Sequence, residues 1–386
     1  MNSHWPTFES DELAAVQNVL SSGKVNYWSG QEGKLFETEF ASYIGCKHAI
    51  AVSNGTVALE VALNACNIKP GDEVITTPRT FIASASAIVM RGAIPVIADI
   101  DPITQNITAK TIAEVITPQT KAIICVHLAG WACDMSPIMA LAKARDLWVI
   151  EDCAQAHGAE YNGQKVGSIG DIAAFSFCQD KIMTTGGEGG MITTNNTSLW
   201  KKAWSFKDHG KDYDTVFHQE HPPGFRWLHQ EFGSNYRLSE MQSAIGRCQL
   251  KKLPSWNQKR HKNAQILQQF LNQFPFINCP APPSSIHHAY YKFYAFFIPE
   301  KAPTNLTRND FISHLNEFGL SAMQGSCFNI THEKAFKQFP NEYKKDLANA
   351  NKLQDTSIMI KVDHTITYNL EALSILRNNL LKTPTS

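Results

Sequence analysis

Two apolar runs near the middle of the chain, each followed at once by polar residues, constrain the fold most strongly. Residues 147–150 and 172–175 have the composition of buried strands. Asp152 follows the first run closely, and Lys181 lies a short distance beyond the second. If the two strands are parallel, both side chains point into the crevice at the carboxyl ends of the strands. We therefore expect an α/β protein with its chemistry at this edge.

The pair of Asp152 and Lys181 has the chemistry of a pyridoxal phosphate (PLP) site. A buried lysine loses basicity, because desolvation disfavours its charged form, and it can then form a Schiff base with a carbonyl. A nearby carboxylate can hold a pyridine nitrogen protonated, which makes the ring an electron sink. On spacing alone, a surface lysine and a helix-capping aspartate would be the simpler interpretation.

Three neighbouring segments change that interpretation: residues 151–158, residues 176–181 and the glycine run at 186–190. Together they resemble the DegT/DnrJ/StrS family of PLP-dependent sugar aminotransferases. The resemblance extends from about Gly33 to about Leu250, and it is specific because several separated motifs occur in the right order. One glycine more than the family pattern stands between the lysine and the Glu-Gly-Gly.

The resemblance implies the PLP-dependent transferase fold (fold type I). We expect residues 1–250 to form a large PLP-binding lobe with an N-terminal arm and a mainly parallel, seven-stranded type of sheet. Residues 251–386 would form a smaller α+β lobe. Strand patterns that alternate with helical ones agree with parallel strands joined by right-handed crossovers.

Local patterns predict several further elements. A helix over residues 9–22 carries Leu13, Val16 and Leu20 on one face. Residues 205–237 are expected to form a long loop, which in a compact domain tends to carry function. A helix that starts near Ser239 would precede Pro254, and a second helix would follow over residues 258–273.

The resemblance also assigns residues to the cofactor. Asp152 would pair with the pyridine nitrogen, Gln155 would approach the cofactor hydroxyl, and Lys181 would carry the cofactor covalently. Ser176 would donate to the phosphate. Gly55 and Thr56, at the start of a helical run, would bind the same phosphate, as a helix N-terminus can; a helix capped by Ser53 or Asn54 is the alternative.

Two further cofactor residues each have a structural alternative. An aromatic residue at the position of Phe81 stacks on the pyridine ring in the family, but Phe81 would otherwise be a core residue. Asn235 would reach across a dimer interface to the neighbouring subunit's cofactor phosphate, which implies a homodimer with shared sites. The alternative for Asn235 is a cap on the helix that begins near Ser239.

Other polar residues are less decisive. His127 could contact cofactor or substrate, or be a satisfied structural histidine. Asp99 and Asp101 indicate turn chemistry, and Glu188 is assigned a turn-stabilising role. His209 slightly favours amination at the 4-position of a sugar. The candidate cations for binding the phosphates of a nucleotide are Lys211, Arg226 and Arg237. It is equally plausible that they are solvated charges on a loop.

Composition excludes some classes of function. The 35 basic and 35 acidic residues balance, so nothing suggests a general nucleic-acid or membrane binder. Nine scattered cysteines without a Cys-x-x-Cys pair indicate free thiols in a reducing compartment, and no metal-ligand spacing is apparent. The longest apolar stretch, residues 81–98, is interrupted by polar residues and a proline, so we expect a cytoplasmic protein without a membrane span.

We therefore expect a PLP-dependent aminotransferase that moves an amino group from an amino acid, by resemblance L-glutamate, to a keto sugar. A nucleotide-linked 4-keto-6-deoxy sugar for cell-surface polysaccharide, such as lipopolysaccharide O-antigen, is the favoured substrate. Alternatives are a 3-keto sugar and a related PLP enzyme acting on amino acids. A dehydratase of the same family, in which the lysine is replaced, is disfavoured by Lys181, and a non-enzymatic regulator is the least favoured.

Overall fold

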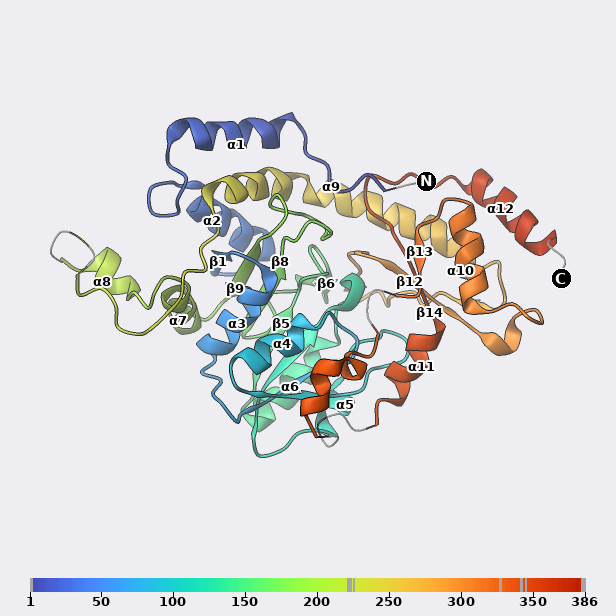
Figure 1. Ribbon diagram of the computed structural model, residues 1–386, viewed down its shortest axis with the longest axis horizontal. Helices are drawn as coiled ribbons and strands as arrows, with labels where there is room; N and C mark the ends of the chain where they lie inside the picture. Colours follow the sequence, from blue (N-terminus) through green and yellow to red (C-terminus); the bar gives the residue numbers. More distant parts are fainter. Residues whose placement is uncertain are drawn as a thin grey trace.

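The computed structural model describes residues 3–220, 224, 226–325, 328–340, 343 and 346–382. Figure 1 shows a larger lobe, built from the first part of the chain, beside a smaller C-terminal one. The helices are α1 (Ser10–Ser22), α2 (Glu32–Ile44), α3 (Gly55–Ala65), α4 (Ala83–Met90), α5 (Ala109–Ala113), α6 (Met135–Arg145), α7 (Thr197–Lys207), α8 (Tyr213–His218), α9 (Glu240–Leu271), α10 (Arg308–Glu317), α11 (Ala348–Thr356) and α12 (Leu370–Lys382). The strands are β1 (His48–Val52), β2 (Glu73–Thr76), β3 (Ile94–Ile97), β4 (Thr120–Val126), β5 (Trp148–Asp152), β6 (Glu160–Tyr161), β7 (Gln164–Lys165), β8 (Ile172–Ser176), β9 (Gly190–Thr194), β10 (Ile277–Asn278), β11 (Ile286–His287), β12 (Phe293–Phe297), β13 (Ala322–Met323) and β14 (Ser357–Ile360).

A seven-stranded sheet in the order β1-β9-β8-β5-β4-β2-β3 forms the centre of the large lobe. Strands β3, β2, β4, β5 and β8 pair in parallel, whereas β9 pairs antiparallel with both β8 and β1. The mainly parallel sheet expected from the sequence is therefore confirmed. In register, Asp152 lies opposite Val126 on β4 and Ala174 on β8, so β4 and β5 end side by side and β8 extends beyond them.

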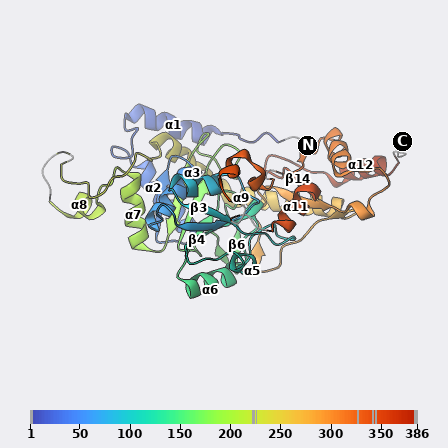
Figure 2. The same ribbon diagram turned by 60° about the horizontal axis from the view of Figure 1, so that its bottom comes forward.

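Both faces of this sheet are buried. Along β1, Ala49 and Ala51 belong to one hydrophobic core, and Ile50 and Val52 belong to another, as the two-residue period of a strand requires. The first core includes residues of α2, α6 and the beginning of α9, and the second includes α3 and α7. Figures 1 and 2 show the helices on the two faces of the sheet. This layering leaves the strand ends as the place for a site.

The C-terminal lobe is α+β, as expected. Its four strands have the order β10-β12-β14-β13, and every pairing is antiparallel. The end of α9 and helix α10 contribute to its core, for example through Phe270 and Phe311. Figure 1 shows α9 extending from the large lobe into the small one, so the predicted division after residue 250 falls inside a helix.

The expected interruption at Pro254 is wrong, because α9 is one continuous helix of 32 residues with this proline inside it. Proline has no N–H to donate, so the carbonyl four residues earlier loses its partner. The neighbouring Leu253 and Trp256 are buried against the core. Packing of the helix face therefore outweighs the local cost of the proline.

Two other local predictions need correction. The stretch 205–237 is not all loop, because it contains the end of α7 and all of α8. On α1, Leu13 is 64% exposed, whereas Glu12 and Val19 are buried. Glu12 forms an ion pair with Lys252 of α9 at 2.8 Å, and this polar contact holds the opposite face of the helix inward.

The described residues bear on two expectations from composition, on membrane-spanning helices and on the state of the cysteines. None of the helices there is both long enough and apolar enough to cross a membrane. The eight cysteines in this part of the chain are free thiols.

Candidate active site

A cavity of about 700 Å³ opens at the carboxyl ends of the parallel strands. This volume is in the range of cavities that hold whole small-molecule ligands. The predicted cofactor residues that line it are Gly55, Thr56, Phe81, Asp152, Gln155, Ser176 and Lys181. Strands β5 and β8 and helices α3 and α4 therefore bring residues from four separate parts of the sequence to one place.

Asp152 is the last residue of β5, and its carboxylate is held in place from two sides. Its Oδ2 accepts a hydrogen bond from Ser84 Oγ at 2.8 Å, and its Oδ1 accepts one from the backbone N–H of Ala154 at 3.1 Å. Burial raises the pKa of Asp152 above its ordinary value, although Ser84, Ala154 and Lys181 each act in the other direction. A buried carboxylate that lacks a close cation is suited to bind a pyridinium N–H.

Lys181 lies in the turn after β8, where its backbone N–H donates to Cys178 O at 3.0 Å. Its Nζ is 3.6 Å from Asp180 Oδ1 and 5.2 Å from the centre of the Tyr291 ring. The Trp5 indole donates to the Lys181 carbonyl at 2.8 Å, so the N-terminal segment also fixes this turn. The side chain is mostly buried but lines the cavity, so its amine can reach a bound carbonyl compound.

Asp180 stands beside the lysine and helps to position it. Burial raises the pKa of the Asp180 carboxyl, but the Lys181 ammonium and a hydrogen bond from the Tyr291 hydroxyl outweigh burial, so the pKa lies below its ordinary value. The Asp180 carboxylate is therefore ionised at neutral pH, and it compensates the charge of Lys181 when the amine is protonated.

The start of α3 has the form of a phosphate site. Asn54 caps the helix by accepting from the Val57 N–H at 2.9 Å, as one of the sequence alternatives predicted. Gly55 packs closely on Ser176, because a Cβ on Gly55 would lie 2.6 Å from Ser176 Cβ. Ser176 Oγ accepts from the Cys178 N–H at 3.3 Å, which leaves its own hydroxyl proton to donate. The capped helix and the phosphate site are therefore compatible.

Phe81 and Gln155 also line the cavity. Phe81 is 65% exposed and lines the cavity, so the alternative of a core aromatic is wrong. Gln155 Oε1 accepts from the Ala129 N–H at 2.8 Å, which leaves its amide N–H groups to donate into the cavity. An aromatic face and an amide donor thus stand at the same cavity as Asp152.

Three predicted residues lie outside this cavity. Asn235, His209 and Arg226 are all exposed, and none belongs to the cavity lining in the described chain. The alternative of a helix cap is wrong for Asn235, because Ser239 caps α9 by accepting from the Gln242 N–H. Asn235 instead pairs with Asp208 through a backbone bridge.

Two of the cations suggested for nucleotide phosphates have another role. Lys211 Nζ and Arg237 Nη1 lie 3.0 and 2.8 Å from the same oxygen of Asp208, which is fully buried. Lys207, also fully buried, is 3.8 Å from the other oxygen. The alternative of a solvated loop charge is wrong for Lys211 and Arg237, because both pair with a buried carboxylate, and their contact with nucleotide phosphates stays a prediction.

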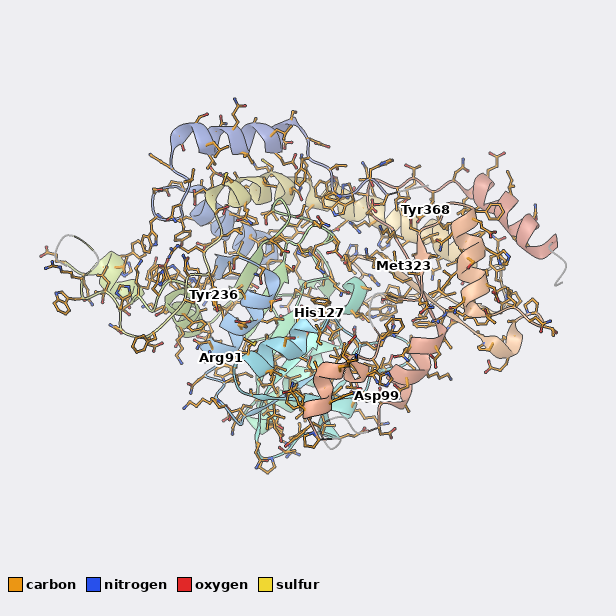
Figure 3. The ribbon with its side chains drawn as sticks, in the orientation of Figure 1. Arg91, Asp99, His127, Tyr236, Met323 and Tyr368 are labelled. Carbon is orange, nitrogen blue, oxygen red and sulfur yellow. The ribbon has the colours of Figure 1, made fainter. Side chains whose placement is uncertain are left out.

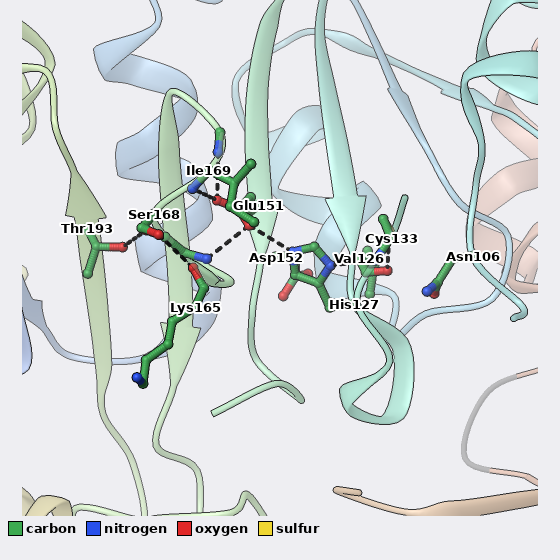
Figure 4. A network of polar contacts seen from close by, with 12 residues as sticks. Asn106, Val126, His127, Cys133, Glu151, Asp152, Lys165, Ser168, Ile169 and Thr193 are labelled. Carbon is green, nitrogen blue, oxygen red and sulfur yellow. Dashed lines mark hydrogen bonds and ion pairs between the residues drawn. The ribbon is translucent and has the colours of Figure 1, made fainter. Parts of the chain in front are cut away.

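His127 belongs to a structural network and not to the cavity. Its Nδ1 accepts from the Cys133 N–H, so its Nε2 carries the proton and donates to Glu151 Oε2 at 3.0 Å. Glu151 also accepts from three backbone N–H groups, and Figure 4 shows the arrangement. Figure 3 labels His127 near the middle of the molecule. His127 and Glu151 also lie near Cys153 with metal-like spacing, but hydrogen bonds occupy both.

Of the two aspartates expected in a turn, Asp101 behaves as predicted, whereas Asp99 contacts a distant helix instead. Asp101 Oδ1 accepts from the N–H groups of Ile103 and Thr104, at 2.9 and 2.8 Å. Asp99, labelled in Figure 3, accepts from the first N–H groups of α11, those of Asn349 and Ala350. Asp99 therefore also ties the two lobes together.

The cavity also contains polar residues that the sequence did not assign to the cofactor, among them Ser84, Asp180, Glu188 and Tyr291. Ser84 follows Phe81 by one helical turn and Asp180 precedes Lys181, so their positions offered a weak signal. Glu188 was expected only to stabilise a turn; its carbonyl accepts from Thr185 Oγ1 at 2.6 Å, but the residue also lines the cavity. Tyr291 comes from a distant segment that carries no motif.

The extra glycine in the loop after Lys181 has a clear conformational use. Gly186 and Gly187 have φ angles of 86° and 126°, a region that favours glycine. The loop then folds back on the segment that follows β8, where the Gln179 N–H donates to the Gly187 carbonyl at 2.9 Å. The insertion is therefore accommodated without moving Lys181 from the cavity.

Comparisons with known proteins agree with this geometry. The model of the DegT/DnrJ/EryC1/StrS aminotransferase family matches residues 6–370, well beyond the stretch from Gly33 to Leu250 expected from the motifs. GDP-perosamine synthase of Caulobacter vibrioides is 48% identical over 229 residues, which is 58% of this chain and 59% of that protein. UDP-N-acetyl-3-dehydro-alpha-D-glucosamine 3-aminotransferase of Acidithiobacillus ferrooxidans is 38% identical over 76% of this chain and 75% of that protein.

The similarity holds in three dimensions over the whole chain. The X-ray structure of an aminotransferase from Psychrobacter cryohalolentis superposes with a TM-score of 0.95 and 48% identity, covering 98% of both chains. The buried Asp152, the reachable Lys181 amine and the capped N-terminus of α3 at the cavity are compatible with PLP. The chain therefore belongs to the DegT/DnrJ/EryC1/StrS aminotransferase family, and pyridoxal phosphate is its cofactor.

Proposed function

We propose that this protein transfers an amino group from L-glutamate to a nucleotide-linked 4-keto-6-deoxy sugar, in the synthesis of a cell-surface polysaccharide such as O-antigen. The observation that carries the proposal is that Asp152 and Lys181 meet in one cavity of about 700 Å³. Support for the sugar comes from similarity to a GDP-perosamine synthase. Free thiols in the described residues support a cytoplasmic location, where nucleotide sugars are made.

Each cavity residue has a distinct task in this proposal. PLP supplies an electron sink for the charge that develops at the carbon losing its proton. Lys181 holds the cofactor and then, as a free amine, moves the proton at the reacting carbon. Asp152 keeps the ring nitrogen protonated, and Ser84 holds Asp152 in place. Phe81 covers the ring plane, which excludes water.

The proposal includes a homodimer with shared active sites. Asn235 does not reach the cavity of its own chain, and nearby Trp227 and Phe232 are 83% and fully exposed. Large exposed aromatic residues beside a functional segment are typical of an interface. Figure 1 shows α8, which belongs to the same segment, at the far end of the large lobe. Asn235 would then complete the phosphate site of the partner, and the exposed His209 and Arg226 would contact its sugar nucleotide.

A 3-keto sugar is the second candidate, and a specific observation favours it. The relative from Acidithiobacillus ferrooxidans, 38% identical over 76% of this chain, is named as a 3-aminotransferase. The two candidates share the whole first half of the reaction, so a substrate screen must separate them.

The test is the visible absorbance of PLP-loaded protein before and after addition of L-glutamate. Wild-type protein should show an absorbance band that bleaches, and the correct keto sugar should restore it. Lys181→Ala should lose the covalent band and the response to glutamate. Lys202→Ala removes an exposed lysine and should behave as wild type.

Three results would contradict parts of the proposal. Protein that never takes up PLP would exclude the enzyme and favour a regulator. A band that ignores L-glutamate would remove the donor and favour a related enzyme acting on other amino acids. Recovery of the band with a 3-keto and not a 4-keto sugar would change the substrate.

A further inference from the structure

A second cavity adjoins the one that contains Lys181. It has a volume of about 170 Å³, and Asp180 and Tyr291 line both cavities. Its other walls come from the N-terminal segment, from α9 and from the C-terminal lobe. Because Asp180 and Tyr291 also contact Lys181, a ligand group in the second cavity would lie one side chain away from the reacting amine.

Three cations line this second cavity: Arg260, Lys292 and Lys361. Among the residues that the structure describes, none of the three forms an ion pair. Arg260 is 1% exposed; its Nη1 donates to the carbonyls of Tyr290 and Tyr291, but its buried Nε has no partner there. Lys292 Nζ is 4.5 Å from the centre of the Tyr291 ring. We call this space the cationic cavity.

The two carboxylates of the cationic cavity are already engaged. Asp180 is bound to Lys181 and to the Tyr291 hydroxyl. Asp363 accepts from the backbone N–H of Thr365 at 3.0 Å and from the Thr365 hydroxyl. In the described residues neither carboxylate lies within ion-pair distance of the three cations, although Asp363 stabilises the charge of Arg260 and Asp180 that of Lys292 at longer range. Burial is the largest cause that lowers the pKa of Lys292, to about 8, and the neighbouring cations lower it further, although Asp180 acts in the opposite direction.

Arg260 is buried and Lys292 and Lys361 are half-buried, and cations removed from water without a close carboxylate are costly unless an anion joins them. The size of the cavity limits that anion, because about 170 Å³ is below the ~300–1,000 Å³ of cavities that hold whole ligands. The cationic cavity therefore suits one end of a ligand whose remainder lies in the larger cavity. A carboxylate fits this description better than a nucleotide diphosphate does.

We propose that the cationic cavity binds the side-chain carboxylate of the amino donor, and the same carboxylate of the 2-oxo acid product. The inference rests on the proposed amino transfer, because the donor must place its amine at Lys181 while its far end lies next to Asp180 and Tyr291. Arg260 also holds the carbonyls of Tyr290 and Tyr291, and so positions the wall between the cavities. The three cations thereby select a dicarboxylic donor over a neutral one.

Binding of glutarate to the PLP-loaded protein tests the site without any reaction, because glutarate has two carboxylates and neither an amine nor a ketone. Lys292→Met and Lys361→Met should each weaken its affinity about tenfold or more, measured by calorimetry, since each removes a charged partner. Lys259→Met is the matched control, because Lys259 is exposed and precedes Arg260 on α9. Unchanged affinity in both test variants would overturn the inference.

Selectivity provides a second readout. The concentration of L-glutamate that half-bleaches the absorbance band should rise about tenfold in Lys292→Met. The value for L-glutamine, which has the same size and a neutral side-chain end, should change little. An equal rise for both amino acids would contradict selection by the side-chain carboxylate.

The two proposals can fail separately. If wild-type protein binds glutarate through Lys292 but never responds to L-glutamate, the carboxylate site stands and the amino-transfer proposal is wrong. If Lys292→Met weakens binding of GDP or UDP and leaves glutarate unchanged, the cavity serves nucleotide phosphates and this inference is wrong.

Discussion

The two faces of β5 carry neighbouring carboxylates with opposite electrostatics. Glu151 faces the buried side, where His127 and three backbone N–H groups donate to it (Figure 4). Asp152 faces the cavity, where one hydroxyl and one N–H donate to it. Burial acts to raise the pKa of both carboxyls. For Glu151 the hydrogen-bond donors outweigh burial, so its pKa is lowered; for Asp152 burial outweighs the donors, so its pKa is raised.

This difference separates a structural charge from a functional one. The fold stabilises the ionised form of Glu151, so its charge is part of the folded state. The folded protein leaves the ionised form of Asp152 without enough partners, so a ligand that brings a positive charge gains binding energy there. The same contrast distinguishes the paired cations around Asp208 from the cations of the cationic cavity.

The largest expected effect comes from Asp152→Asn. The amide cannot hold the ring nitrogen protonated, so we expect kcat to fall by about 10²–10⁴-fold, in the range of positioned proton-holding groups. Thermal stability without cofactor should not fall, because the pKa of Asp152 is raised and the folded protein gains nothing from its charge. Steady-state kinetics measure kcat, and a melting curve measures thermal stability. A large drop in melting temperature would contradict the contrast between a functional Asp152 and a structural Glu151.

Glu151→Gln should give the reverse pattern. The amide nitrogen of the glutamine would face N–H donors at a position where a carboxylate oxygen accepted their hydrogen bonds. His127 cannot adapt by changing to its other tautomer, because its Nδ1 already accepts a hydrogen bond from the Cys133 N–H. We expect a loss of about 3 kcal/mol in the free energy of unfolding, since each unsatisfied buried donor costs about 1–3 kcal/mol. Denaturant unfolding measures this loss. Unchanged stability with lost PLP binding would instead make Glu151 a site residue.

The smallest expected effect concerns pH and His157, on the buried side of the sheet. Burial lowers the pKa of His157 to about 3, and the cations of Lys181 and Arg260 contribute. In the unfolded chain this histidine binds a proton as the pH falls below about 6.5, whereas in the folded protein it does so only near pH 3. The folded protein therefore loses stability as the pH falls from about 6.5 toward 3. For this one histidine the loss at pH 5 is about 2 kcal/mol relative to pH 7.

His157→Phe should remove that share of the pH dependence. The ring lies among Phe175 and Phe177, at 5.5 and 5.6 Å between centres, so an aromatic replacement suits the site. Unfolding free energies of both proteins at pH 7 and pH 5 give the difference. An unchanged loss of stability in the variant would mean that His157 is protonated in the folded protein.

The sequence was informative where local chemistry repeats along the chain. Residues 147–152 and 172–181 predicted neighbouring parallel strands, and the sheet confirms them. The cofactor residues around Asp152 and Lys181 all line one cavity. Phe81 shows where the reasoning needed the structure, because its apolar side chain suits a core equally well and only its exposure decides.

Other predictions failed because they depended on contacts between distant segments. Pro254 indicated a break, but packing along α9 keeps the helix continuous. Solvated loop charges were one interpretation of Lys211 and Arg237, but both pair with the buried Asp208. Neither outcome is visible in the residues nearby in sequence, since long-range packing and pairing overrule local preference.

The sequence by itself determined the class of sheet, the lysine and the aspartate, because strand patterns and small motifs express local physics. Tertiary structure alone decided which charges are compensated. Tyr291, Lys292 and Lys361 come from the C-terminal lobe, and they meet Asp180 only because α9 joins the lobes and its Arg260 holds the backbone at Tyr291. Charge compensation depends on distances between segments far apart in the chain, and only folding sets those distances.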